Sequence, residues 1–124
     1  MAKILIIDDD QWILKVFQQI LESDGHEIVT AVDGQEGIDV YRRERDSIDL
    51  VMTDMVMPVK DGLKLIMEME KEFGDVKIIA ISGGGIIEPE RYLTLAESIG
   101  TRKTLEKPVN KQELLDAVND VLRE

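Results

Sequence analysis

The stretch ILIIDDD, residues 4–10, places a short apolar run directly before three consecutive aspartates. A run of this length that is rich in β-branched residues predicts a strand buried on both faces of a sheet. Similar runs recur at 48–52 and 76–81, and two thinner candidates lie at 27–31 and 101–106. We therefore expect three central strands flanked by two edge strands.

Segments with helical periodicity alternate with these strands, and the first and third of them end near Gly25 and Gly74. The predicted helices cover 13–21, 35–45, 63–69, 89–99 and 110–122. Five alternations of strand and helix predict an α/β fold with right-handed crossovers. The expected architecture is a doubly wound five-stranded parallel sheet in the order 2-1-3-4-5 with five helices, a flavodoxin-like arrangement.

Length and composition bound the class of protein. A chain of 124 residues fits one domain, 1–124, with a core of its own. The absence of cysteine excludes a disulfide framework, and no signal-like stretch or apolar run of about 18 residues occurs, so we expect a cytoplasmic protein without membrane insertion. With 26 acidic and 15 basic residues, the net charge of -11 argues against direct nucleic-acid binding.

Acidic residues follow two of the predicted central strands. Asp8 and Asp9 come after the first strand, and Asp54 closes the third. In the expected strand order these two strands flank the switch point, where ligands bind at the carboxyl ends. Three carboxylates gathered there repel one another and require a cation, and an oxygen-only ligand set favours Mg²⁺.

The aspartates also have a structural alternative. Asp10 precedes the first helical pattern and suits an N-cap, and Asp8 or Asp9 alone could serve as a cap too. Asp54 ends an apolar strand before a proline-containing loop, where no capping role is available. Asp54 is therefore the stronger functional candidate.

Two further polar residues are expected on the same rim of the sheet. Ser82 ends the fourth strand ahead of three glycines, and Lys107 follows the fifth strand. The glycines by themselves indicate a turn, and no nucleotide-binding loop pattern accompanies them. A carboxylate nucleophile, a metal, a hydroxyl and a lysine are the groups that phosphoryl transfer needs. The negative charges of the three carboxylates would balance the positive charges of Mg²⁺ and Lys107.

The motifs ILIIDDD, DLVMTDMVMPVKDG, AISGGG and LEKPV occur in this order along the chain. Together they resemble the receiver domains of bacterial response regulators over essentially the whole length. The resemblance implies that Asp54 accepts a phosphoryl group, that Asp9 and Asp54 bind Mg²⁺ and that Asp8 binds it partly through water. It also implies that the carbonyl of Val56 completes the protein ligands.

By the same resemblance, Ser82 donates a hydrogen bond to the phosphoryl group and Lys107 pairs with it. The Lys107–Pro108 bond is expected to be cis, which proline permits. Thr104 departs from the family, which commonly has an aromatic ring there, so the inward rotation of a ring is not expected. The six methionines are expected to fill the core, with exposure to partners as an alternative for Met55 and Met57 beside the acceptor.

The resemblance implies a signalling protein of a two-component phosphorelay and no separate enzyme activity. The expected phosphodonor is a histidine kinase or a histidine phosphotransfer protein, and the domain would slowly hydrolyse its own acyl phosphate. The phosphorylated form would alter binding to a downstream protein target. Because little sequence follows the last helix, we expect a stand-alone receiver or an excised domain.

Two other functions share parts of this pattern. A haloacid-dehalogenase-like phosphatase would use Asp8 and Asp10, with Ser82 and Lys107, but needs a further acidic motif after the lysine. A flavodoxin-like flavin module would need aromatic loops, and the chain has only Trp12, two tyrosines and two phenylalanines. Turnover of p-nitrophenyl phosphate and the yellow colour of a flavin distinguish these alternatives.

Overall fold

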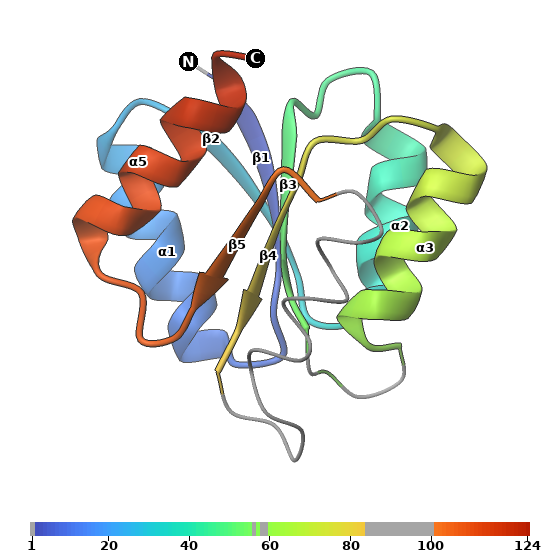
Figure 1. The fold of residues 1–124 in the computed structure, drawn as a ribbon, viewed down its shortest axis with the longest axis horizontal. Coiled ribbons are helices and arrows are strands. Elements are labelled where there is room, and N and C mark those ends of the chain that lie inside the picture. The colour runs from blue at the N-terminus through green and yellow to red at the C-terminus, as the bar shows by residue number, and fades with distance from the viewer. Residues whose placement is uncertain (1, 56, 58–59, 84–100) are drawn as a thin grey trace.

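The computed structural model describes residues 2–55, 57, 60–83 and 101–124. Its strands are β1 Lys3–Ile7, β2 Glu27–Ala31, β3 Leu50–Asp54, β4 Ile78–Ser82 and β5 Lys103–Glu106. Its helices are α1 Gln11–Ser23, α2 Gly34–Glu44, α3 Gly62–Phe73 and α5 Lys111–Leu122. All strands pair in parallel in the order β2-β1-β3-β4-β5 (Figure 1), which confirms the predicted topology. The helix predicted at 89–99 lies outside the described residues.

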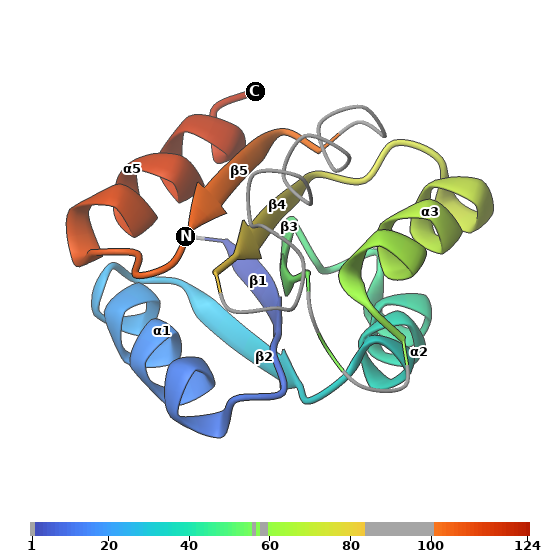
Figure 2. The ribbon, with the colours of Figure 1, turned by 60° about the horizontal axis from the view of Figure 1, so that its bottom comes forward.

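The sheet is covered on both faces. Helices α1 and α5 lie on one face, and α2 and α3 lie on the other (Figures 1 and 2). Successive side chains of β1 point to opposite faces of the sheet. Leu5 and Ile7 pack in the core under α2 and α3. Ile4 and Ile6 pack in the core under α1 and α5. This alternation explains why the central strands are apolar throughout.

The thin strands β2 and β5 occupy the two edges, as predicted. The apolar runs at 48–52 and 76–81 begin two residues before strands β3 and β4, because Ile48 and Val76 are buried core residues outside the strands. At their carboxyl ends, β3 and β4 extend beyond the apolar runs, to Asp54 and Ser82. Asp54 and Ser82 are therefore strand residues, held in register opposite Ile81 and Glu106.

Side-chain caps fix where the helices begin. The Asp10 carboxylate accepts hydrogen bonds from the backbone N–H groups of Trp12 and Ile13 at 3.0 and 3.3 Å, which confirms it as the N-cap of α1. At α5, the Asn110 side chain accepts from the backbone of Glu113 at 2.8 Å. Because α1 starts directly behind the carboxyl end of β1, Asp8 and Asp9 are confined to a short turn at the sheet edge.

Candidate functional site

Three carboxylates meet at the carboxyl ends of β1 and β3. Asp8, Asp9 and Asp54 each offer an oxygen, and these three oxygens lie within 4.8 Å of one another. They line a cavity of about 390 Å³ together with Asp10, Ile13, Gly83 and Lys107. The structure therefore brings together acids that are more than forty positions apart in the sequence.

Asp8 is a buried acid with both carboxylate oxygens engaged. Its Oδ1 accepts a hydrogen bond from the backbone of Asp10 at 2.9 Å, and its Oδ2 accepts one from Nζ of Lys107 at 3.1 Å. Burial raises the pKa of Asp8, and these two donors only partly offset the rise. Asp8 is thus held in place, with one side already committed to Lys107.

Asp54 is 7% exposed, and its Oδ1 lies 3.4 Å from Nζ of Lys107. Burial, followed by the negative charge of Asp8, raises the pKa of Asp54 from its ordinary 3.8 to about 6, while Lys107 acts in the opposite direction. The charged form of Asp54 is therefore unfavourable with only Lys107 beside it. A further cation at this position would stabilise it.

Asp9 differs from the other two acids because its side chain is exposed. Within the described residues its carboxylate takes part in no hydrogen bond or ion pair, so it is free to bind a ligand. Oxygen donors of this kind are the ones that Mg²⁺ takes in proteins. The acids present thus fit a hard divalent cation, whereas Val56, the expected source of a carbonyl ligand, lies outside the described residues.

Lys107, which directly follows the carboxyl end of β5, bridges Asp8 and Asp54. Burial lowers the pKa of Lys107, but the charges of Asp54 and Asp8 outweigh burial, and the pKa is raised overall. The backbone N–H of Lys107 donates to the carbonyl of Ser82 at 2.7 Å, and the Lys107–Pro108 peptide is cis as expected. A Cβ at Gly83 would come within 2.4 Å of Cβ of Lys107, so Gly83 gives the lysine room.

Ser82 contributes a buried hydroxyl at the end of β4. Its Oγ has no hydrogen-bond partner in the described structure. A buried hydroxyl without a partner is unfavourable, and such groups in proteins commonly serve a ligand. Ser82 is therefore available to donate to an anion bound beside Asp54.

Two expectations about neighbouring residues need comment. The alternative that Met55 and Met57 are exposed is wrong, because both are buried in the α2/α3 core, where apolar packing outweighs their loop position. Thr104 lies in β5 opposite Ala80, so no ring occupies that place.

The residue that sequence reasoning missed is Lys60, whose side chain is largely covered and bound to Glu68. A single lysine in a loop gives no sequence signal for such a contact.

Comparison with known proteins assigns the family. The family model described as the response regulator receiver domain matches residues 4–119. The chemotaxis protein CheY of Treponema pallidum is 33% identical over 98% of this chain and 83% of its own length. The transcriptional regulatory protein GlrR of Escherichia coli is 36% identical over 99% of this chain, which spans only 27% of GlrR.

Solved structures agree. A receiver domain protein from Clostridium thermocellum superposes with a TM-score of 0.92 at 36% identity, covering 99% of this chain and 95% of that one. The CheX–CheY–BeF3–Mg complex from Borrelia burgdorferi gives 0.89 at 28% identity, covering 97% and 88%.

Fold and site together define a phospho-accepting signalling domain. The chain belongs to the response regulator receiver domain family of two-component systems. Receiver domains bind Mg²⁺ at the acidic end of the sheet and interact with histidine kinases and downstream targets. In the part of the chain that the structure describes, the helices are too short or too polar to cross a bilayer.

Proposed function

We propose that residues 1–124 act as one receiver domain in which Asp54 is the phospho-acceptor. The observation that carries this proposal is the position of Asp54 within 4.8 Å of Asp8 and Asp9, with Lys107 alongside. An oxygen of Asp54 attacks the phosphorus of a phosphohistidine. The new P–O bond forms as the P–N bond breaks, and the bonding pair leaves with the imidazole of the donor.

The other site residues have separate roles in this transfer. Asp8, Asp9 and Asp54 would hold Mg²⁺ together with the carbonyl of Val56. Bound Mg²⁺ supplies positive charge to the transferring oxygens. Ser82 donates its free hydroxyl to one phosphoryl oxygen, and Lys107 pairs with another after leaving Asp8 and Asp54. The same site returns the phosphoryl group slowly to water.

The donor is a histidine kinase or a histidine phosphotransfer protein in the cytoplasm. An apolar groove of about 430 Å³ supports this partner, because it adjoins the acidic cavity and shares Ile13, Gly83 and Lys107 with it. Its outer wall includes Trp12, which is largely exposed. A donor helix could seat apolar side chains there while its phosphohistidine reaches Asp54. Phosphorylation then alters the affinity of the domain for a downstream protein.

Labelling by a phosphodonor tests the proposal. Wild-type protein incubated with acetyl phosphate and Mg²⁺ should gain one phosphoryl group by intact-protein mass spectrometry, whereas Asp54→Asn should gain none. Asp9→Ala should remain folded but bind Mg²⁺ at least about tenfold more weakly, because it lacks one direct ligand. Equal labelling of the wild type and Asp54→Asn would contradict the assignment of the acceptor.

The phosphatase alternative requires a free acid at Asp10. That carboxylate instead accepts two backbone hydrogen bonds as the N-cap of α1, which places it poorly for proton transfer to a leaving group. The receiver function is therefore the one that the geometry favours. Turnover of p-nitrophenyl phosphate by the purified protein would restore the alternative.

A further inference from the structure

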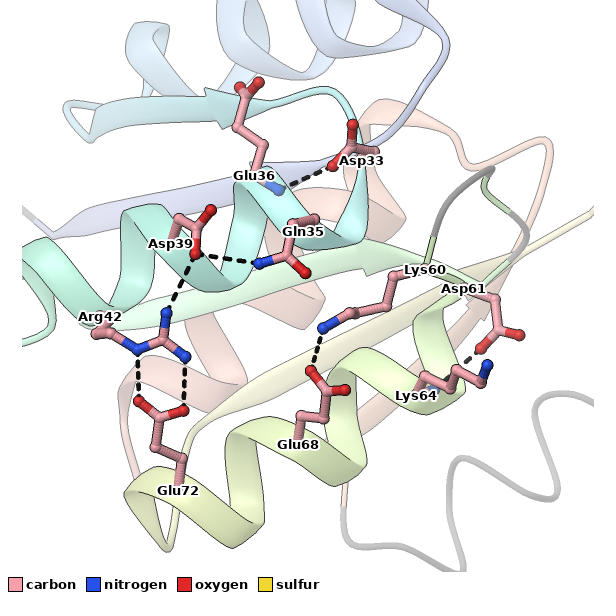
Figure 3. Close-up of polar contacts among 10 residues, drawn as sticks. All are labelled: Asp33, Gln35, Glu36, Asp39, Arg42, Lys60, Asp61, Lys64, Glu68 and Glu72. Carbon is pink, nitrogen blue, oxygen red and sulfur yellow. Dashed lines mark hydrogen bonds and ion pairs between the residues drawn. The ribbon is translucent and has the colours of Figure 1, made fainter.

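Lys60 is a loop residue that contacts both helices of the α2/α3 layer. It lies in the connection from β3 to α3, six positions after Asp54, and its Nζ donates to Oε2 of Glu68 on α3 (Figure 3). The Lys60 side chain is only 13% exposed, which is low for a lysine at a loop position. Its aliphatic stem is thus covered, and the ammonium end is fixed to the helix.

The backbone of Lys60 also meets the first residue of α2. A Cβ added to Gly34 would come within 2.4 Å of the Lys60 carbonyl oxygen and 2.8 Å of the Lys60 Cβ. Gly34 is itself fixed, because the preceding Asp33 caps α2 through a 2.8 Å hydrogen bond from the backbone of Glu36 (Figure 3). One residue of the connection therefore touches both helices on this face of the sheet.

Both ends of the same connection are tied to the sheet or to each other. The N–H of Met55 donates to the carbonyl of Ile81 at 2.9 Å, and the N–H of Gly62 donates to the carbonyl of Met55 at 3.0 Å. Asp61 caps α3 by accepting from the backbone of Lys64 at 2.9 Å. Gly62 is thus hydrogen-bonded to Met55 at the end of β3, and Lys60, two residues before Gly62, is fixed to the helices.

We infer that Lys60 is a positioning residue that, through the Gly62–Met55 hydrogen bond, ties the carboxyl end of β3 to α2 and α3, and so sets the affinity of the acidic site for Mg²⁺. The inference rests on the proposed function of that site. Lys60 is not among the described residues that line the acidic cavity. It acts by restricting where the end of β3 can place Asp54 relative to Asp9, because a preorganised ligand set binds a metal more tightly than a mobile one.

The chain offers a matched control on the same two helices. Arg42 of α2 binds Glu72 of α3 through two hydrogen bonds of 2.6 and 2.7 Å (Figure 3). This pair also joins a cation to an acid across the α2/α3 layer, but it lies near the carboxyl ends of both helices. Glu72 interacts with Lys60 through charge, and no hydrogen bond joins these two residues in the described structure. Arg42→Met therefore removes an interhelical ion pair while leaving the anchor of Lys60 intact.

The test compares Lys60→Met with Arg42→Met in the whole chain. We expect Lys60→Met to raise the Kd for Mg²⁺ about fivefold in an NMR-detected titration, the factor that about 1 kcal/mol of lost positioning corresponds to. In metal-free protein, the Gly62 amide should exchange with solvent faster in Lys60→Met by about the same factor. Arg42→Met should change neither quantity by more than about twofold.

Kinetics add a readout that simple loss of stability would not produce. For Lys60→Met, the Mg²⁺ concentration giving half-maximal labelling by acetyl phosphate should rise, while the rate at saturating Mg²⁺ stays within about twofold of wild type. The charge-swapped double variant, Lys60→Glu with Glu68→Lys, should recover part of the lost affinity.

Two results would overturn the inference: a Kd and Gly62 exchange rate in Lys60→Met that match wild type, or equal changes in Arg42→Met. If wild-type protein neither binds Mg²⁺ nor accepts a phosphoryl group, the proposed function fails. The exchange of Gly62 in metal-free protein would still show whether Lys60 anchors the connection.

Discussion

The two ends of the sheet use similar charged residues to opposite effect. At the amino ends of the strands, Lys3 binds Glu44 at 2.8 Å, and Arg102 binds Asp75 and Glu124 at 2.8 Å each. At the carboxyl ends, three acids gather, and two of them, Asp8 and Asp54, share the ammonium of Lys107. Among these described residues, each acid at the amino end has a cation as partner, whereas Asp9 at the carboxyl end has none.

The pKa values record this difference. The hydrogen bond from Lys3 lowers the pKa of Glu44, whereas burial raises the pKa of both Asp8 and Asp54. The amino-end pairs are partly open to water, so they lose little hydration and act as modest ties. Asp8 and Asp54 at the carboxyl end are buried with only Lys107 as a cation beside them in the described structure. That end therefore favours the binding of a further cation, at the expense of the stability of the metal-free protein.

The largest effect that separates the two ends is expected for Asp54→Asn. The raised pKa of about 6, against an ordinary 3.8, means that the folded protein holds this proton more tightly than the unfolded chain does. The stabilisation is fully present below the unfolded pKa and is lost as the pH rises through the folded pKa. A shift of roughly two units corresponds to about 3 kcal/mol.

Urea unfolding in EDTA measures that difference. At pH 8 Asp54→Asn should be about 3 kcal/mol more stable than wild type, and the gain should shrink toward zero near about pH 4. Asp120→Asn is the matched control, because hydrogen bonds from Arg123 and Lys103 lower the pKa of Asp120 and its loss should destabilise the protein. A gain for Asp54→Asn of the same size at both pH values would point to packing instead of charge.

A smaller effect of opposite sign is expected when Lys107 is removed. Lys107→Met leaves Asp8 and Asp54 buried beside each other without their shared cation, and we expect a loss of about 2 kcal/mol at pH 8 in EDTA. The loss should be smaller at about pH 5, where Asp54 takes up a proton. Urea unfolding midpoints of Lys107→Met and wild type at the two pH values, with and without Mg²⁺, test this expectation. A loss of stability that is independent of pH would show that packing of the lysine stem matters more than its charge.

The contrast also shows what the sequence could predict. Apolar runs predicted three central strands, and the strand order then placed the acids after β1 and β3 at one edge, because parallel strands share their carboxyl ends. The site geometry followed from topology alone, without knowledge of any side-chain contact. The same apolar runs located the starts of β3 and β4 poorly, since Ile48 and Val76 are buried without pairing in the sheet.

Pairings between distant residues could not be predicted in this way. Lys107 reaches Asp8 across 99 positions, and the Lys60 backbone meets Gly34 in another segment. Neither contact has a local pattern, because each depends on how two loops pack once the sheet has formed. The sequence likewise could not decide between the core and an exposed position for Met55 and Met57, because their burial depends on the packing of the α2/α3 core.

The smallest effect is expected at the amino end, from Arg102→Gln. Arg102 donates to both oxygens of Asp75 and to Glu124, but Asp75 is largely exposed, so the pairs are well solvated. We expect a loss of less than about 1 kcal/mol, most of it abolished in about 1 M salt by screening. The affinity for Mg²⁺ should not change, because Arg102 lies at the start of β5 and the acids lie at the opposite end of the sheet. A change in Mg²⁺ affinity would mean that the two ends are coupled through β5. The amino-end ion pairs would then contribute to metal binding as well as to stability.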